Sequence, residues 1–227
     1  MKDTNSTYDD AITAPADLVK HGYAKGSARR EQILNTASRF FAEKGYHRAT
    51  ILDIAAACDI SRAGLLYYFP TKEKLLEAVL QARDKEERAR FVPFVNNSGA
   101  MGVLQGMVKL AEHNRLIPGL IELFVHLSSE ASNPAHPAHD YFVARYARIR
   151  KDTARTIRTA KKNKYIRSNV DANDASLRLT ALMDGLQTQW LLDNEINMAT
   201  PIQNMLEEWM TPQGRQIFEE ALDKQTY

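Results

Sequence analysis

The sequence predicts an all-α protein in which a small head of helices precedes a larger helical domain. Apolar residues recur at intervals of three and four over most of the chain, which is the spacing of one buried helix face. Hydroxyl residues stand where helix N-caps belong, and alternating strand patterns are scarce. The 227 residues are 44% hydrophobic, which is enough to bury a core in each of two domains.

The first helix is predicted from Ser27 to a C-cap at Gly45, because Ile33 and Phe41 belong to one apolar helical face. The preceding residues 1–26 mix Asp, Thr, Ser, Gly and Pro with no sustained period. We therefore expect a flexible N-terminal arm over 1–26 and a fold that begins near Ser27.

Three further helices are expected in the head, each opened by a hydroxyl cap. Thr50, Ser61 and Thr71 stand directly before apolar helical patterns, and Asp53 completes an acidic form of the capping box after Thr50. The last of the three helices links the head to the rest of the chain. The head is thus predicted over residues 27–90.

A loop is predicted after the head, because Pro93, Asn96, Asn97, Ser98 and Gly99 follow one another closely. The pattern beyond it is again helical, so a second domain is expected over residues 91–227. Its predicted helices span 100–114, 116–131, 138–164, 172–193, 201–210 and 213–224.

The segment from Ile51 to Phe69 has the steric pattern of a helix-turn-helix, in which two short helices cross closely and the second enters the DNA major groove. Close crossing requires a small residue, which Ala55 supplies, and Leu65 falls on the inward face of the second helix. Asp59 stands at the turn, where a short polar side chain tolerates a left-handed backbone. The pattern therefore predicts DNA binding.

The outward residues of the second helix are the candidate DNA contacts. Arg62 is the expected reader of guanine, whereas Ala63 and Gly64 allow the helix N-terminus to approach the duplex closely. Neighbouring hydroxyl and amino groups are expected to hold phosphates, which set the register without reading sequence. The predicted DNA-binding residues are Thr50, Ser61, Arg62, Ala63, Gly64, Leu66, Tyr67, Tyr68 and Lys72.

The run ILDIAAACDISRAGLLYYFPTKEKLLEAVL, preceded by AEKGYHRAT, resembles the TetR family of one-component transcriptional regulators over about residues 28–90. The resemblance implies a homodimer, a variable ligand-binding domain in the remaining chain, no catalysis and, usually, repression. Asp59 departs from the family pattern, which usually has glycine there, and Gly64 and Leu66 depart from it as well. The positions that match the pattern directly are Ser61, Leu65, Phe69 and Lys72.

A buried central helix is predicted from Leu116 to Leu127, because this stretch is apolar nearly all round. With its Met-rich and aromatic neighbours it would form either an ordinary core or an apolar cavity for a small molecule. The family resemblance favours the cavity, and ligand binding is then expected to tilt the fourth helix and release the DNA. The candidate pocket residues are Met107, Ile117, Leu120, Phe124, Tyr146 and Met183.

Ten basic residues lie between Arg145 and Arg167 against a single acid, Asp152. This amphipathic segment is expected to present its charges outward, either as a solvated face or as a contact for an anionic ligand or for DNA. His136 and His139 would share a face if helical, but spacing alone does not make a ligand set. We therefore predict no metal site and no cofactor.

The segment 175–192 is apolar over more than one face. An apolar face that a single chain leaves uncovered usually marks a symmetric interface. We predict a homodimer through a four-helix bundle, which would place two recognition helices about one DNA turn apart on an inverted-repeat operator. The candidate interface residues are Leu182, Leu186, Trp190, Met205, Trp209 and Phe218.

Composition limits the other classes of function. A net charge of +2 disfavours a polycation that coats nucleic acid or membrane, and the single Cys58 excludes an internal disulfide. No apolar run has the length of a membrane span or the form of a signal peptide, so a cytoplasmic location is expected. No nucleophile with its base and no paired carboxylates indicate an enzyme. The rival hypothesis is a DNA-bound adaptor of the same fold whose second domain docks a protein.

Overall fold

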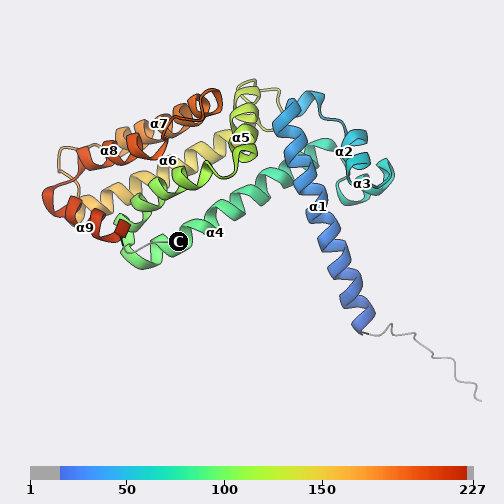
Figure 1. The fold of residues 1–227 in the computed structure, drawn as a ribbon, viewed down its shortest axis with the longest axis horizontal. Helices are drawn as coiled ribbons and strands as arrows, with labels where there is room; N and C mark the ends of the chain where they lie inside the picture. The colour runs from blue at the N-terminus through green and yellow to red at the C-terminus, as the bar shows by residue number, and fades with distance from the viewer. Residues whose placement is uncertain (1–15, 224–227) are drawn as a thin grey trace, which may run out of the picture.

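The computed structural model describes the backbone of residues 16–223, and the side chains from Gly26 onward except those of 87, 88, 90–98 and 221–223. Within that part of the chain every regular element is a helix, so the all-α prediction is confirmed. None of these helices is both long enough and apolar enough to cross a membrane. In chain order they are α1 (Ala16–Arg48), α2 (Ile51–Ala57), α3 (Arg62–Tyr68), α4 (Lys72–Asn114), α5 (Pro118–Glu130), α6 (His139–Lys162), α7 (Ala172–Leu192), α8 (Ala199–Trp209) and α9 (Pro212–Asp223) (Figure 1).

The first helix is longer than predicted. α1 begins at Ala16, so residues 16–26 of the expected flexible arm are helical, and residues 1–15 of that arm lie outside the described part. No proline interrupts the chain between Pro15 and Pro70, which allows the helix to continue backwards from Ser27. Gly45 breaks the helix with φ 71 and ψ 171, as a glycine C-cap does.

The loop predicted around Pro93–Gly99 is wrong, because α4 is helical from Lys72 to Asn114. Gly99 nevertheless has φ 55, outside the helical region. In Figure 1 the chain leaves the head along α4, reaches the far end of the molecule and doubles back before α5. A reversal of this kind needs one residue with positive φ, which glycine adopts at little cost, so no longer loop is required.

Two buried clusters form the core. The first crosses from the head into the second domain, because Phe41 of α1 belongs to the same cluster as Leu127 of α5 and Phe142 of α6. The second cluster fills the space between the returning part of α4 and the helices α5 to α9, with Leu206 and Phe218 fully buried. The head therefore does not have a core of its own: it shares one with α5 and α6.

Candidate functional site

The helix-turn-helix pattern is realised by α2 and α3. The hydroxyl of Thr50 accepts a bond from the backbone N–H of Asp53 at 3.1 Å, and that of Ser61 accepts one from Gly64 at 3.0 Å. Both helices thus begin at the residues predicted to cap them. Each hydroxyl satisfies one of the backbone N–H groups that a helix N-terminus leaves without a partner.

The turn between the two helices is held by its backbone and by α1. Asp59 has φ 54, which confirms the left-handed turn predicted there. Ala55 and Leu65 are buried, with Cys58 between them as a buried free thiol. The guanidinium of Arg29 donates to the carbonyl oxygen of Cys58 at 3.1 Å. This tie from α1 to the end of α2 was not foreseen from the sequence, because 29 residues separate its partners.

The predicted DNA contacts of α3 differ in exposure. Arg62 and Ala63 are exposed, and Tyr67 is 84% exposed and packs edge-on against Tyr68. Gly64, Leu66 and Tyr68 are half-buried, whereas Thr50 and Ser61 are exposed. A face with Arg62 and Tyr67 outermost is therefore open to a large partner.

Lys72 is more constrained than the sequence suggested. Its ammonium donates to the carbonyl oxygen of His47 at 3.3 Å and lies 4.2 Å from the centre of the Tyr46 ring. Burial lowers the pKa of Lys72, although the charges of Glu73 and Glu130 act the other way. An ammonium group has three N–H bonds, so a phosphate contact would share it with these intramolecular partners.

Exposed basic residues at the end of α1 were not among the predicted contacts. Lys44 and Arg48 are both exposed, and Arg48 precedes the α2 cap by two residues. Arg48 donates to the backbone carbonyl oxygen of Lys44 at 3.0 Å, and the ammonium of Lys44 lies 4.0 Å from the carboxylate of Asp53. The sequence could have indicated these two residues as phosphate contacts, because they are basic and closely precede a capped helix.

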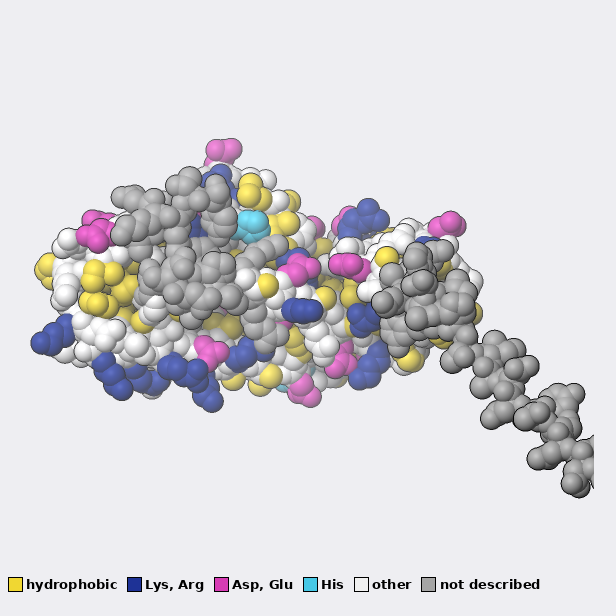
Figure 2. All heavy atoms as spheres, turned by 90° about the horizontal axis from the view of Figure 1, so that it is seen from below, with side chains coloured by type: hydrophobic (Ala, Val, Ile, Leu, Met, Phe, Trp, Pro, Cys, Tyr) yellow, Lys and Arg dark blue, Asp and Glu magenta, His cyan; other side chains and the backbone are white. Residues whose placement is uncertain are grey.

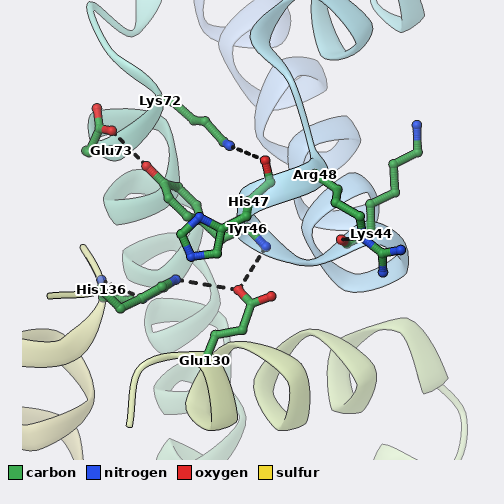
Figure 3. Close-up of polar contacts among 9 residues, drawn as sticks. Lys44, Tyr46, His47, Arg48, Lys72, Glu73, Glu130 and His136 are labelled. Atoms are coloured by element: carbon green, nitrogen blue, oxygen red, sulfur yellow. Dashed lines mark hydrogen bonds and ion pairs between the residues drawn. The ribbon is translucent and has the colours of Figure 1, made fainter. Parts of the chain in front are cut away.

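A polar junction joins the end of α1 to the ends of α4 and α5 (Figure 3). Glu130, the last residue of α5, accepts a hydrogen bond from the backbone N–H of Tyr46 at 2.9 Å. Its carboxylate also lies 3.5 Å from Nε2 of His136. A Cβ atom at Gly45 would collide with this carboxylate, so the glycine provides both the positive φ and the room.

The other side of the junction reaches α4. The hydroxyl of Tyr46 donates to Glu73 at 2.8 Å, in the first turn of that helix. Burial, followed by the hydrogen bond and charge of Glu73, raises the pKa of Tyr46. Two hydrogen bonds to the Glu73 carboxylate lower its pKa: first the one from the backbone N–H of Glu73, and then the one from the Tyr46 hydroxyl. Tyr46 thus stays a neutral donor between a carboxylate on α4 and one on α5.

A second polar link joins α4 to α6. Asp84 is 4% exposed, and its carboxylate accepts from Arg145 at 3.2 Å and from Arg148 at 2.7 Å. Burial alone would raise the pKa of Asp84, but hydrogen bonds from Arg148 and Tyr141, together with the charge of Arg145, lower it. The carboxylate is therefore ionised and fixes α4 against α6.

A cavity of about 980 Å³ lies between α4, α5, α6 and α7. Five of the six predicted pocket residues line it, whereas Ile117 does not. Ile117 precedes the first residue of α5, where the backbone has φ −134. The lining residues in question are Met107, Leu120, Phe124, Tyr146 and Met183.

The polar lining of this cavity was not predicted. Asp84, Arg145, Arg148 and Asp184 all contribute to its wall. The basic segment between Arg145 and Arg167 indicated the two arginines of this lining. The two aspartates were not indicated, because an isolated Asp in a helical pattern does not show which helix it faces. Figure 2 shows Lys and Arg side chains gathered along one edge of the larger domain. On α6 the exposed basic residues include Lys151, Arg155, Arg158 and Lys162.

Tyr146 and Asp184 form a half-buried pair in the cavity wall. Burial, then the charge of Asp184, raises the pKa of Tyr146 to about 12. Burial raises the pKa of Asp184 as well, against the hydrogen bond from Tyr146 and the charge of Arg145. The Tyr146 hydroxyl therefore donates to the carboxylate, and the arrangement offers a polar contact deep in an apolar wall.

The predicted interface residues fall into two groups. Leu186, Trp190 and Phe218 are buried within the chain, at 6%, 5% and 0% exposure, so their placement in a dimer surface is wrong. They face the second core because α7 and α9 bury one face against the rest of the domain. Leu182, Met205 and Trp209 are half-buried. Large exposed apolar side chains on the same helices are Leu177 and Leu192.

Two histidines of the C-terminal domain bond to backbone carbonyl oxygens. Nδ1 of His126 lies 2.7 Å from the carbonyl oxygen of Ala42, and Nδ1 of His139 lies 2.8 Å from that of Ala131. Among the described residues no three His, Cys, Asp or Glu side chains are grouped as metal ligands.

Comparison with known proteins identifies two matching family models. Residues 33–79 match the model of bacterial regulatory proteins of the tetR family. Residues 124–210 match the C-terminal model of BetI-type transcriptional repressors. The first match covers the capped helices α2 and α3, and the second covers most of the cavity wall from α5 onward.

Individual relatives match over most of their length. The chain is 26% identical to the HTH-type transcriptional repressor Rv1474c of Mycobacterium tuberculosis, over 70% of this chain and 81% of the relative. It is 29% identical to the repressor AcnR of Corynebacterium efficiens, over 69% and 78%. Among solved structures, a transcriptional regulator from Saccharomonospora viridis in complex with choline is 29% identical, with a TM-score of 0.70, covering 80% of this chain and 96% of that one.

Proposed function

Because the chain belongs to the TetR family of transcriptional regulators, we propose that it binds an inverted-repeat operator as a homodimer and leaves it when a small molecule fills its cavity. The family is one of DNA-binding regulators and not of enzymes, and the curated relatives are repressors. The observation that carries the proposal is α3, a short, capped helix with exposed Arg62 and Tyr67 on its outer side.

DNA recognition would follow from how α3 is held. Leu65 anchors it to the core, so the helix is rigid where it meets DNA. In our proposal Arg62 reads a guanine edge in the major groove, and Thr50, Ser61, Tyr67 and Lys72 contact phosphates. We add Arg48 to the phosphate contacts because it is exposed beside the cap of α2. Ala63, Gly64 and Leu66 would form the close surface against the bases.

We propose that dimerisation uses the outer faces of α7 and α8. The half-buried Leu182, Met205 and Trp209 would be completed by the exposed Leu177 and Leu192. Two helices from each protomer would form a four-helix bundle around a two-fold axis. The axis would present the two α3 helices to successive turns of the same DNA groove.

Release by a ligand is supported by the path of α4. Its first turn lies at the junction with Tyr46, and Asp84 and Met107 further along it line the cavity. A ligand that changes how α4 packs would therefore act on the head directly. The Saccharomonospora viridis regulator forms a complex with choline, which supports a small-molecule ligand for this chain as well. The adaptor hypothesis required a filled core, and a cavity of about 980 Å³ disfavours it.

The proposal is tested by selecting bound fragments of genomic DNA with the purified chain, then measuring affinity for the recovered site by fluorescence anisotropy. We expect an inverted repeat and a complex of two chains. Arg62→Ala should weaken binding about 5- to 150-fold, because one good contact between arginine and guanine contributes about 1–3 kcal/mol. Arg158→Ala, an exposed arginine on α6 that bonds to Asn173 and lies outside the proposed DNA and dimer contacts, is the matched control. Failure to enrich any site, or equal affinity of the Arg62 variant and wild type, would reject the proposal.

A further inference from the structure

One end of the cavity is charged, and its charges come from two different helices. Asp84 of α4 and Arg145 and Arg148 of α6 all line the wall. Asp84 is 4% exposed and the side chain of Arg145 is 12% exposed. Charges in such a poorly solvated wall interact more strongly than charges at a surface. The rest of the wall is largely apolar and includes Met107, Leu120, Ile121, Val125 and Met183.

We propose that the effector is an amphipathic anion, an apolar molecule with a carboxylate head that Arg145 and Arg148 bind in competition with Asp84. The inference rests on the proposed function, since it names the ligand class of that cavity. The apolar wall would take the body of the ligand, and the two guanidinium groups would take its head.

The geometry of the guanidinium groups favours an anion at this end. A guanidinium carries five N–H donors in a fixed fork that fits a carboxylate. Arg148 uses Nη2 toward Asp84 at 2.7 Å, and its side chain is 42% exposed, so it can be reached from the cavity mouth. Two guanidinium groups can therefore hold a second carboxylate beside the first.

The surroundings of the mouth favour an anion as well. Arg155 lines the cavity with a side chain that is 66% exposed, and Lys151 is exposed on the same helix. Two acids also face this space. Asp152 pairs with Arg155 at 3.4 Å, and Asp184 accepts the hydroxyl of Tyr146. The excess of basic groups along α6 would attract anions toward the entrance.

Binding of this kind would favour release of DNA. A second carboxylate next to Asp84 repels it and takes hydrogen-bond donors that it needs while buried. The state with ligand bound would then be more stable when α4 moves away from α6. A ligand shifts an equilibrium only through such a difference in affinity between two states. Because α4 begins at the junction with Tyr46, its displacement would reorient α3.

The test uses sodium octanoate, decanoate and dodecanoate, each with the alcohol and the trimethylammonium compound of equal chain length, below their micelle concentrations. Binding to the full chain is measured by calorimetry. We expect at least one carboxylate to bind and to lower operator affinity, and its alcohol and ammonium counterparts to bind at least about tenfold more weakly. Arg148→Gln should weaken carboxylate binding about tenfold or more, with Arg148→Lys in between.

Arg158→Gln is the matched control, because Arg158 lies on α6, is exposed and bonds to Asn173 outside the cavity. Equal or tighter binding of the ammonium compounds, no binding of any carboxylate, or unchanged affinity in Arg148→Gln would overturn the inference. So would a carboxylate that binds without lowering operator affinity. Operator binding in the absence of any probe separates the two proposals: its loss rejects the proposed function, whereas a chain that binds its operator but no carboxylate rejects only this inference.

Discussion

The turn between α2 and α3 and the link between α4 and α6 are held by different kinds of interaction. The turn depends on apolar burial of Ala55 and Leu65 and on hydroxyl caps that bond three residues ahead. The link depends on Asp84, whose partners lie 61 and 64 residues away on another helix. Apolar packing loses stability with small displacements in any direction, whereas a charged contact can exchange one partner for another.

The two regions therefore differ in the kind of contact that holds them and in the parts of the chain that those contacts join. The turn between α2 and α3 is held by buried apolar side chains and two hydroxyl caps, with one polar tie from Arg29 of α1. The cavity wall and the junction contain polar contacts that join separate helices, at Asp84 and at Glu130 respectively. Four substitutions, taken in decreasing order of expected effect, test this difference.

The largest effect is expected from Leu65→Ala. Leu65 is fully buried and is the buried anchor of α3, so its truncation leaves a cavity in the shared core. We expect the free energy of unfolding to fall by about 2–5 kcal/mol, with operator binding lost together with stability. Urea denaturation measures the change. Leu52→Ala is the control, because Leu52 is 63% exposed on α2 and should change stability little.

Asp84→Asn should have the next largest effect. The substitution keeps the shape of the side chain and removes the charge that Arg145 and Arg148 neutralise. We expect a loss of about 1.5–3 kcal/mol in unfolding free energy, the range for hydrogen bonds to charged groups. Asp174→Asn removes an exposed ion pair with Arg178 and should cost less than about 1 kcal/mol. Equal effects of the two variants would show that the α4 to α6 link contributes no more than a surface pair.

The same distinction explains how far the sequence could be interpreted. The caps at Thr50, Ser61 and Thr71 were predictable because donor and acceptor are three residues apart and one residue type serves the purpose. The left-handed residue at Asp59 was predictable for the same local reason. The reversal at Gly99 was misjudged as a loop, because composition alone does not show that one positive φ is enough.

The long-range contacts were outside the reach of such reasoning. Periodicity indicated that α7 had more than one apolar face, but not which face the chain itself covers, so Trp190 was assigned to the dimer. Five of the candidate pocket residues line the cavity, because a cavity and a core both require apolar faces. Asp84 and Glu130 were missed because the sequence around a single acid in a helix does not indicate a partner on another helix.

A smaller effect is expected from Ser61→Ala, which tests the local side of the comparison. The Ser61 hydroxyl caps α3 at 3.0 Å from the backbone nitrogen of Gly64. Its loss should cost about 1 kcal/mol in unfolding free energy. Ser61→Thr keeps the acceptor and should restore most of the difference. An alanine variant as stable as wild type would mean that the helix is held by Leu65 alone.

The smallest effect concerns the junction and its dependence on pH. His136 is 5% exposed, and burial lowers its pKa although the charge of Glu130 acts the other way. Below the ordinary value of 6.5 the unfolded chain therefore binds a proton more readily than the folded one, and stability falls as pH is lowered. We expect the free energy of unfolding to decline from about pH 7 to 5 because of this group.

His136→Gln should remove this decline, whereas Asp84→Asn should retain it, because the lowered pKa of Asp84 places its titration below the ordinary value of 3.8. Urea denaturation at a series of pH values compares the three proteins. The Asp84 carboxylate contributes stability that is present above that value and is lost as pH falls through its folded pKa, so its variant should differ from wild type throughout the range from pH 7 to 5. A decline that persists unchanged in His136→Gln would place the pH-sensitive contact elsewhere than at the joint between α5 and α1.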